Sequence, residues 1–219
     1  RGLVSLVGAG PGNPDLLTLK ALDCLQRAGV VYYDNLISDE VLDRIRRDAK
    51  RVYVGKRRGV EGMPQHLINE MLISDAQEGL RVVRLKGGDP LVFGRGGEEL
   101  EALKSAGIQL EVIPGVTAAL GSAAVAGIPL THRDSAQSVR FITAQLSTDN
   151  NEIDWAELAR EKQTLVVYMG LAELPVLTRK LMDYGMTETM PVAVVSRASH
   201  PDQTVVLGTL IEIADKVKS

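Results

Sequence analysis

The sequence predicts an α/β fold divided into two α/β domains. Short apolar runs alternate with longer segments whose apolar residues recur at helical spacing, which is typical of a parallel sheet covered by helices. In the second half, two strand-like runs are joined by a short polar segment with Pro201, which indicates a hairpin and hence a mixed sheet. The turn dipeptide Pro114-Gly115 separates the halves, so we expect domains at residues 1–114 and 115–219.

The first domain contains strands and helices in strict alternation. Its strands are expected at residues 3–7, 30–33, 51–54, 81–85 and 109–113. Its helices are expected at residues 16–28, 38–48, 65–78 and 97–106. We expect this alternation to give a mostly parallel sheet, because a helix between two strands lets the chain return to the same edge.

The second domain opens with an uncharged stretch, residues 112–131. Because its apolar content is mostly Ala and Val, interrupted by Gly and Pro, it favours a buried helix at about 116–126 over a membrane span. The further strands are expected at 139–145, 164–168, 192–197 and 204–208. The further helices are expected at 155–160, 174–183 and 210–216.

Composition narrows the functional class. The 25 Lys and Arg and 28 Asp and Glu residues give a net charge of −3, without the basic surplus expected of a nucleic-acid-binding protein. The single cysteine, Cys24, excludes an internal disulfide, and no signal peptide begins the sequence, so we expect a cytoplasmic protein. The histidines, His66, His132 and His200, have no metal-ligand spacing, and no metal is expected.

A glycine loop, Gly8-Ala9-Gly10-Pro11-Gly12, lies between the first strand and the first helix. This is the place of a dinucleotide-binding loop, which would make the chain an oxidoreductase. However, Asn13 stands where that fingerprint requires a third glycine, and Pro11 removes an N–H that could bind phosphate. The loop is therefore either a tight turn or a place where the backbone approaches another ligand.

A second glycine-rich stretch, residues 84–99, follows the fourth strand. Ligands of open α/β sheets bind at the carboxyl ends of the strands, where the glycines let the chain come close to a ligand. Asp34 and Lys56 follow the second and third strands, and Arg84 ends the fourth. In a parallel sheet these three converge at one edge, although Asp34 alone could equally be a turn residue.

Five segments together resemble the tetrapyrrole methylases: residues 7–20, 84–99, 114–118, 127–133 and 168–170. Within that family the sequence is similar to uroporphyrinogen III C-methyltransferases, including the methyltransferase module of bifunctional siroheme synthases. The resemblance implies two α/β domains with the active site in the cleft between them, and a homodimer. It implies S-adenosylmethionine-dependent methylation of uroporphyrinogen III at two pyrrole β-carbons, which gives precorrin-2 and S-adenosylhomocysteine.

Matching positions assign roles by the same resemblance. Asp34 corresponds to the proton acceptor and Lys56 to the proton donor. Substrate would be bound by Arg84, Arg95 and Arg133. The cofactor would be held by Pro11, Gly87, Gly88, Asp89, Val92, Thr117, Ala118, Met169 and Ala198. Two positions depart from the family pattern: Ala198 replaces a glycine, and Ala144-Gln145 stands where related sequences often have Gly-His.

The resemblance leaves alternatives open. The abrupt start at Arg1, directly before a strand, suggests fusion to, or partnership with, a precorrin-2 dehydrogenase and chelatase module. The chain could instead be another precorrin C-methyltransferase, or a non-catalytic tetrapyrrole-binding module. The product could enter siroheme, cobalamin or heme d1 synthesis. No nucleic acid or membrane is expected as a partner.

Overall fold

The computed structural model describes residues 2–56, 59–144 and 153–218. The chain divides into two compact units, Arg1–Ala118 and Ala119–Ser219. The boundary between the two units thus lies at the start of the helix Ala118–Ala126, a few residues after the Pro114-Gly115 turn. Each unit has a hydrophobic core of its own.

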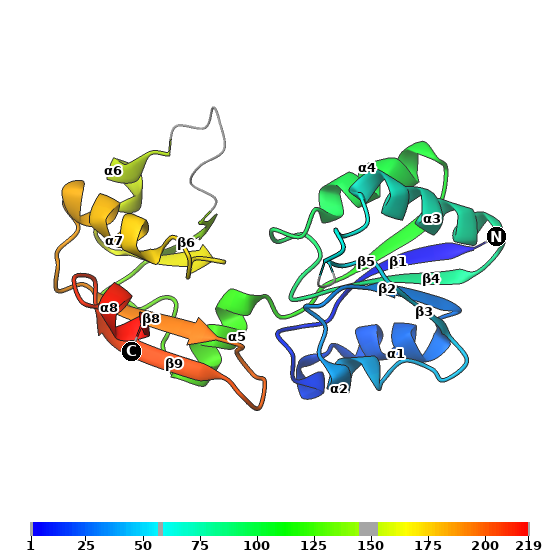
Figure 1. Ribbon diagram of the computed structural model, residues 1–219, viewed down its shortest axis with the longest axis horizontal. Helices are drawn as coiled ribbons and strands as arrows, with labels where there is room; N and C mark the ends of the chain where they lie inside the picture. The colour runs from blue at the N-terminus through cyan, green and yellow to red at the C-terminus, as the bar shows by residue number, and fades with distance from the viewer. Residues whose placement is uncertain (1, 57–58, 145–152, 219) are drawn as a thin grey trace. The chain divides into compact units, whose positions relative to one another are not determined.

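The described part of unit 1 contains a five-stranded sheet in the order β3-β2-β4-β1-β5 (Figure 1). Every neighbouring pair is parallel, so all five strands end at the same edge. The strands are β1 (Leu3–Gly8), β2 (Val30–Tyr33), β3 (Lys50–Tyr53), β4 (Arg81–Lys86) and β5 (Gln109–Ile113). The predicted strands are confirmed to within one residue at each end.

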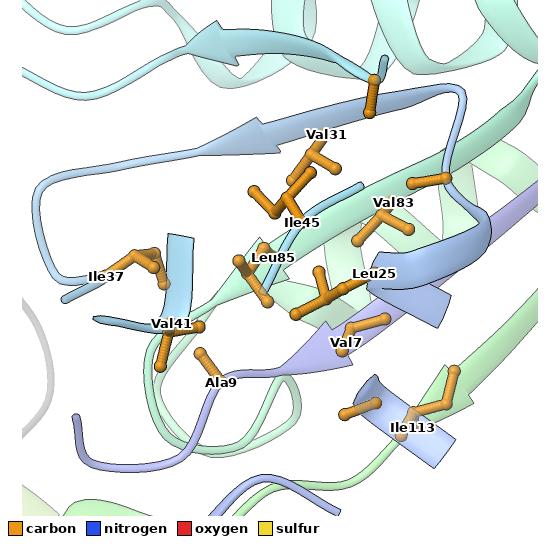
Figure 2. Packing of buried hydrophobic residues seen from close by; sticks show 13 residues of the cluster. Val7, Ala9, Leu25, Val31, Ile37, Val41, Ile45, Val83, Leu85 and Ile113 are labelled. Carbon is orange, nitrogen blue, oxygen red and sulfur yellow. The ribbon is translucent and has the colours of Figure 1, made fainter. Parts of the chain in front are cut away.

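Helices cover both faces of this sheet, with α1 and α2 on one face and α3 and α4 on the other (Figure 1). The elements are the short 3-10 helix η1 (Pro14–Leu16), α1 (Leu19–Arg27), α2 (Asp39–Leu42), α3 (Gln65–Gln77) and α4 (Gly96–Ser105). Alternation along each strand divides the core between the faces. In β4, Val83 and Leu85 pack with Leu25 of α1 (Figure 2), whereas Val82 packs on the opposite side with Leu72 and Leu103.

Two predicted helices are shorter in the structure. The first begins at Leu19, because Thr18 caps it by accepting a hydrogen bond from the Ala21 N–H at 3.0 Å. The second was predicted over 38–48 but ends as α2 at Leu42. The Arg46 N–H donates to the Leu25 carbonyl at 3.0 Å, and this bond to the end of α1 replaces a further helical turn.

Unit 2 contains two separate two-stranded sheets within its described residues, where one mixed sheet was expected. Strands β6 (Ser138–Thr143) and β7 (Gln163–Tyr168) pair in parallel, and β8 (Pro191–Ser196) and β9 (Thr204–Thr209) form the predicted antiparallel hairpin. Residues Pro191–Ser196 and Thr204–Thr209 pair along the whole length of both strands, and neither strand pairs with β6 or β7 within the described residues. The helices are α5 (Ala118–Ala126), α6 (Trp155–Leu158), α7 (Leu174–Asp183) and α8 (Ile213–Lys218).

The uncharged stretch of residues 112–131 forms the end of β5, a turn and the short helix α5. Among the described helices, none combines the length and the apolar character needed to cross a bilayer. The expected helix is confirmed, although it begins at Ala118 and not at residue 116.

Three glycines allow close backbone contact where β1, β4 and β5 end. A Cβ atom added to Gly115 would lie 2.2 Å from the Gly88 carbonyl oxygen and 2.9 Å from the Gly8 backbone. A Cβ atom added to Gly8 would lie 2.6 Å from the Gly115 nitrogen. These distances are too short for a carbon atom, so only glycine fits at these positions without moving the strand ends.

We expect Gly115→Ala to destabilise the chain by about 1–3 kcal/mol, because the added methyl overpacks rigid backbone. The matched control is Gly97→Ala, since a Cβ at Gly97 meets nothing within 4 Å. The control lies in α4 and should keep or slightly raise stability, by less than about 1 kcal/mol. Urea unfolding of both variants measures the difference, and equal stabilities would contradict the packing argument.

Candidate functional site

The two glycine-rich loops pair with each other at the carboxyl edge of the unit 1 sheet. The Gly10 N–H donates to the Gly88 carbonyl at 3.1 Å, and the Gly88 N–H donates to the Gly10 carbonyl at 2.8 Å. Both glycines have positive φ, at 69° for Gly10 and 64° for Gly88, which other residues rarely adopt. The structure therefore brings together two motifs that lie about 80 residues apart in the sequence, which sequence spacing alone cannot show.

This pairing decides what the first loop can bind. The N–H of Ala9 donates to the Lys86 carbonyl at 2.7 Å, and the N–H of Gly10 is used as described above. Pro11 has no N–H to offer. The Gly12 carbonyl accepts a 2.6 Å hydrogen bond from the Ser38 hydroxyl. The N–H groups of residues 9–11 thus do not form the phosphate cradle of a dinucleotide-binding loop, which argues against the oxidoreductase alternative.

The residues assigned to the cofactor in unit 1 gather around Asp89. Its Oδ1 accepts from the Leu91 N–H at 2.9 Å, and its Oδ2 accepts from the Gly115 N–H at 3.1 Å. A Cβ at Gly88 would lie 3.5 Å from the Thr117 Cα, so the loop after β4 and the segment after β5 are neighbours. Gly87, Gly88, Asp89, Thr117 and Ala118 consequently occupy one part of the sheet edge.

Large apolar side chains are exposed beside these glycines. Leu36 is 67% exposed and lies close to Gly87, whose added Cβ would be 3.1 Å from the Leu36 Cβ. Leu91 and Phe93, in the loop after β4, are 55% and 46% exposed. Bare glycine backbone next to exposed apolar side chains fits a ligand that has both polar groups and a flat apolar ring. Both S-adenosylmethionine, through its adenine, and a tetrapyrrole meet this description.

Asp34 and Lys56 follow the neighbouring strands β2 and β3. Asp34 is half-buried, and its Oδ1 accepts from the Leu36 N–H at 3.0 Å, which fixes the carboxylate at the strand end. The Lys56 side chain is exposed, and its carbonyl accepts a 2.8 Å hydrogen bond from the Tyr53 hydroxyl. Gly55 lies between them, since its added Cβ would be 3.1 Å from the Asp34 Cβ. The convergence predicted for these two strand ends is therefore present.

Arg84 has a different environment from the one expected of a substrate-binding residue. Its side chain is only 6% exposed, and its Nε donates to Glu99 Oε2 at 2.9 Å. Lys86 donates from Nζ to the other oxygen, Glu99 Oε1, at 2.5 Å. Arg84 is thus inside unit 1, within an ion cluster of Arg84, Lys86 and Glu99, which we call the buried triad.

Burial lowers the pKa of the Lys86 ammonium group, and the neighbouring positive charge of Arg84 lowers it further. The Glu99 carboxylate opposes both effects, and the charge of Asp34 also acts to raise the pKa of Lys86. The sequence interpretation assigned no role to Lys86 or Glu99, although both lie in the stretch 84–99. The available signal was the alternation of Arg84 and Lys86 with Val83 and Leu85, which places both cations on the face covered by α4.

Arg95 and Val92 lie in the loop between β4 and α4. Arg95 is 64% exposed, has a left-handed backbone with φ of 56°, and pairs with Glu98 at 3.4 Å. Phe93 is also left-handed, with φ of 49°. Such conformations cost roughly 1–3 kcal/mol each and persist where surrounding contacts impose them. Val92 is half-buried, and its N–H donates to the Asp89 carbonyl at 3.3 Å.

The other predicted residues belong to unit 2. Met169 directly follows β7, with a φ of 55° and 69% exposure, and Ala198 is buried in the connection between β8 and β9. Arg133 is exposed and lines an open pocket of about 420 Å³ with Thr131, His132, Ala136 and Gln137. Ala144 is buried after β6, and Gln145 lies outside the described residues. Met169, Ala198 and Ala144 follow β7, β8 and β6, whereas Arg133 lies between α5 and β6.

Within the described residues, the structure has no cluster of three His, Cys, Asp or Glu side chains that could hold a metal ion. Cys24 lies near the Ser5 hydroxyl and the Glu111 carboxylate, which is 3.8 Å from its Sγ. Burial, and then the charge of Glu111, raises the pKa of this thiol. A protonated thiol of this kind is a weak nucleophile.

Comparison with known proteins places this geometry in a family. The model of the tetrapyrrole (corrin/porphyrin) methylases matches residues 3–214. The siroheme synthase of Hahella chejuensis is 55% identical over 217 residues, which is 99% of this chain and 46% of the relative. A siroheme synthase of Escherichia coli O1:K1 is 57% identical over 215 residues, 98% of this chain and 47% of the relative. The chain thus spans about half the length of these relatives.

Solved structures of similar proteins point to the same family. A uroporphyrin III C-methyltransferase of Thermus thermophilus, in its native form, has a TM-score of 0.83 and 40% identity, covering 98% of this chain and 86% of its own. The enzyme complexed with S-adenosyl homocysteine is 41% identical, with a TM-score of 0.83 and coverages of 98% and 91%. A cobalt precorrin-4 methyltransferase has a TM-score of 0.89 and 30% identity, with coverages of 99% and 89%. The glycine loops at the sheet edge and these matches together show that the chain belongs to the tetrapyrrole methylases.

Proposed function

We propose that the chain is a uroporphyrinogen III C-methyltransferase that uses S-adenosylmethionine to methylate two pyrrole β-carbons, giving precorrin-2. The observation that carries this proposal is the pairing of Gly10 with Gly88, which sets bare backbone beside exposed apolar side chains at the sheet edge. It is supported by the similar Thermus thermophilus enzyme, whose structure is complexed with S-adenosyl homocysteine.

We assign the cofactor site to Pro11, Gly87, Gly88, Asp89, Val92, Thr117, Ala118, Met169 and Ala198. S-adenosylmethionine supplies an electrophilic methyl group on a sulfonium. The main task of these residues is to position that group for in-line attack, because displacement at carbon depends mostly on the alignment of the two reactants. The Asp89 carboxylate already joins the segments after β4 and β5, so it holds the backbone of the site in place.

Asp34 is the proposed proton acceptor. When a pyrrole β-carbon forms a bond to the methyl group, the carbon–sulfur bond breaks and the macrocycle becomes cationic, so it must release a proton. A half-buried carboxylate with one oxygen already held by the Leu36 N–H presents a fixed acceptor for that proton. Lys56, on the neighbouring strand end, is the proposed proton donor.

The proposed substrate-binding cations act in two ways. Arg95 and Arg133 are exposed and can contact the carboxylates of the substrate directly. Arg84 is paired with Glu99 inside unit 1. We therefore propose that it acts on the substrate through its buried positive charge and not by direct contact. Through these cations a chain with a net charge of −3 can still bind a polyanion.

A second candidate function is methylation of a different precorrin. It is favoured by the similarity to the cobalt precorrin-4 methyltransferase, whose TM-score of 0.89 is higher than the 0.83 of the uroporphyrin III C-methyltransferase structures. The cofactor residues would be the same, and the substrate cations would differ. A non-catalytic tetrapyrrole-binding module is a third possibility, in which the cofactor residues would have no role.

We further propose that the chain works as a homodimer in the cytoplasm, joined to or partnered with a precorrin-2 dehydrogenase and chelatase module. The similarity to siroheme synthases about twice as long as this chain supports such a partner. The single cysteine is consistent with a reducing compartment.

Methyl transfer is the direct test. The chain is mixed with S-adenosylmethionine and uroporphyrinogen III under anaerobic reducing conditions, and the product is followed by mass spectrometry and absorbance. We expect the mass to rise by two methyl groups. Methylation of another tetrapyrrole, but not of uroporphyrinogen III, would establish the second candidate. Cofactor binding with no transfer to any tetrapyrrole would contradict both candidates.

Asp34→Asn should lower kcat by about 10²–10⁴-fold, because an amide cannot accept the proton. The amide oxygen can still accept the Leu36 N–H, so the local turn and the binding of S-adenosylhomocysteine should be unchanged. The control is Asp48→Asn, whose side chain is 82% exposed. Stopped-time product assays and isothermal titration calorimetry separate the two effects, and wild-type turnover in a folded Asp34→Asn variant would remove the proton-acceptor role.

A further inference from the structure

The buried triad places three charges where water does not reach. The side chains of Arg84, Lys86 and Glu99 are 6%, 7% and 0% exposed. Glu99 uses one oxygen for each cation, at 2.9 Å and 2.5 Å. Arg84 also donates from Nη1 to the carbonyls of Tyr32 and Leu85, both at 3.4 Å. Two cations face one anion, so the cluster has a surplus positive charge.

Stability alone is a poor explanation for such a cluster. Moving charges out of water costs several kcal/mol per ion, and apolar residues of similar volume often stabilise a core as well or better. The surrounding positions of the same face are apolar, among them Leu72, Val82 and Leu103, so an apolar side chain at position 99 would be compatible with them. The cluster therefore points to a requirement other than core stability.

The triad joins the two ends of one loop. Strand β4 ends at Lys86 and helix α4 begins at Gly96, so Glu99, in the first turn of α4, binds back to the last residue of the strand. The loop between them, residues 87–95, contains four of the proposed cofactor residues and Arg95 of the substrate site. The ion pairs thus hold the end of β4 at a fixed distance from the start of α4, and the loop connects these two points.

The loop itself needs such an anchor. Phe93 and Arg95 have left-handed backbones, which a freely moving loop would leave. The loop is also tightly packed: a Cβ at Gly96 would lie 2.1 Å from the Pro90 carbonyl oxygen, and one at Gly94 would lie 3.2 Å from the Lys86 Cε. The Lys86 side chain therefore packs against the loop at Gly94 while its ammonium group binds Glu99.

We infer that Glu99 is a positioning residue, which acts through Lys86 and Arg84 to hold residues 87–95 in the conformation that binds S-adenosylmethionine and presents Arg95. The inference rests on the proposed function for its substrate and cofactor. It differs from a purely structural role in one respect: weakening the triad should loosen the loop and the ligand sites while the rest of the fold remains intact.

The first test is Glu99→Gln, with Glu101→Gln as the matched control. Glu101 is on the same helix and is exposed. Glutamine keeps the size of the side chain but leaves the two buried cations without their counter-charge. We expect the affinity for S-adenosylhomocysteine, measured by calorimetry, to fall about 10-fold or more, and kcat/KM to fall by about 100-fold, as small misplacements of reacting groups do. The control should match the wild type.

Hydrogen–deuterium exchange gives a readout that needs neither substrate nor turnover. In Glu99→Gln, amides of residues 87–95 should exchange faster, whereas amides of β1 and β5 should keep their wild-type rates. Equal acceleration throughout unit 1 would show a general loss of stability and would overturn the inference. So would a folded variant with wild-type exchange and wild-type cofactor affinity.

Lys86→Met keeps the inference testable if Glu99→Gln does not fold. Methionine fills the volume of the lysine stem and leaves Glu99 paired with Arg84 alone, so the charges of the remaining pair balance. We expect this variant to fold, with faster exchange in residues 87–95 and a weaker affinity for S-adenosylhomocysteine. Wild-type values for both would overturn the inference. Failure of the wild-type chain to methylate uroporphyrinogen III would instead count against the proposed function, because both readouts here are independent of that substrate.

Discussion

The close approach of the backbone where β1, β4 and β5 end is the constraint on which the candidate site in unit 1 depends. Gly8, Gly88 and Gly115 lie so close together that a carbon added to Gly8 or Gly115 would collide with main-chain atoms. This contact lets the segment after β1 pair with the segment after β4, through reciprocal hydrogen bonds between Gly10 and Gly88. Asp89 then reaches the Gly115 N–H, and the three loops become one surface.

Within unit 1, much of the proposed cofactor site is glycine backbone. Backbone groups at Gly87 and Gly88 and apolar side chains such as Leu36 are suited to a ligand with an adenine ring and a polar chain. The proposed acid–base residues, Asp34 and Lys56, follow the strands at the other side of β4. This division agrees with methyl transfer, a reaction whose rate depends on alignment and on the removal of one proton.

The buried triad belongs to the same arrangement. Alternation along β4 places Val83 and Leu85 against α1, while Arg84 and Lys86 face α4. A loop with two left-handed residues is held between this strand and this helix, and the ion pairs with Glu99 join its ends. Burying the charges is costly, and so is the left-handed backbone of the loop. We connect the two features, because the ion pairs of Glu99 join the strand and the helix between which the loop lies.

Local pattern in the sequence was sufficient to locate the strands of unit 1 and the motifs that follow them. Apolar runs and helical periodicity located every strand of its sheet, and the parallel arrangement followed because helices separate the strands. The same reasoning placed Asp34 and Lys56 at one edge, since parallel strands end together. It overestimated the helix after β2, because the bond from Arg46 to Leu25 that ends it joins residues far apart in the chain.

Only the tertiary structure decided which charged residues are buried. From the sequence, Arg84 and Arg95 look alike, as cations within one glycine-rich stretch, yet the structure buries Arg84 against Glu99 and exposes Arg95. The pairing of Gly10 with Gly88, and the separation of β6 and β7 from the β8–β9 hairpin, were equally beyond reach. The physical reason is that local periodicity determines the face of a strand on which a side chain lies, whereas its partner on that face comes from another element. Partner choice depends on packing across the whole domain, which no local pattern contains.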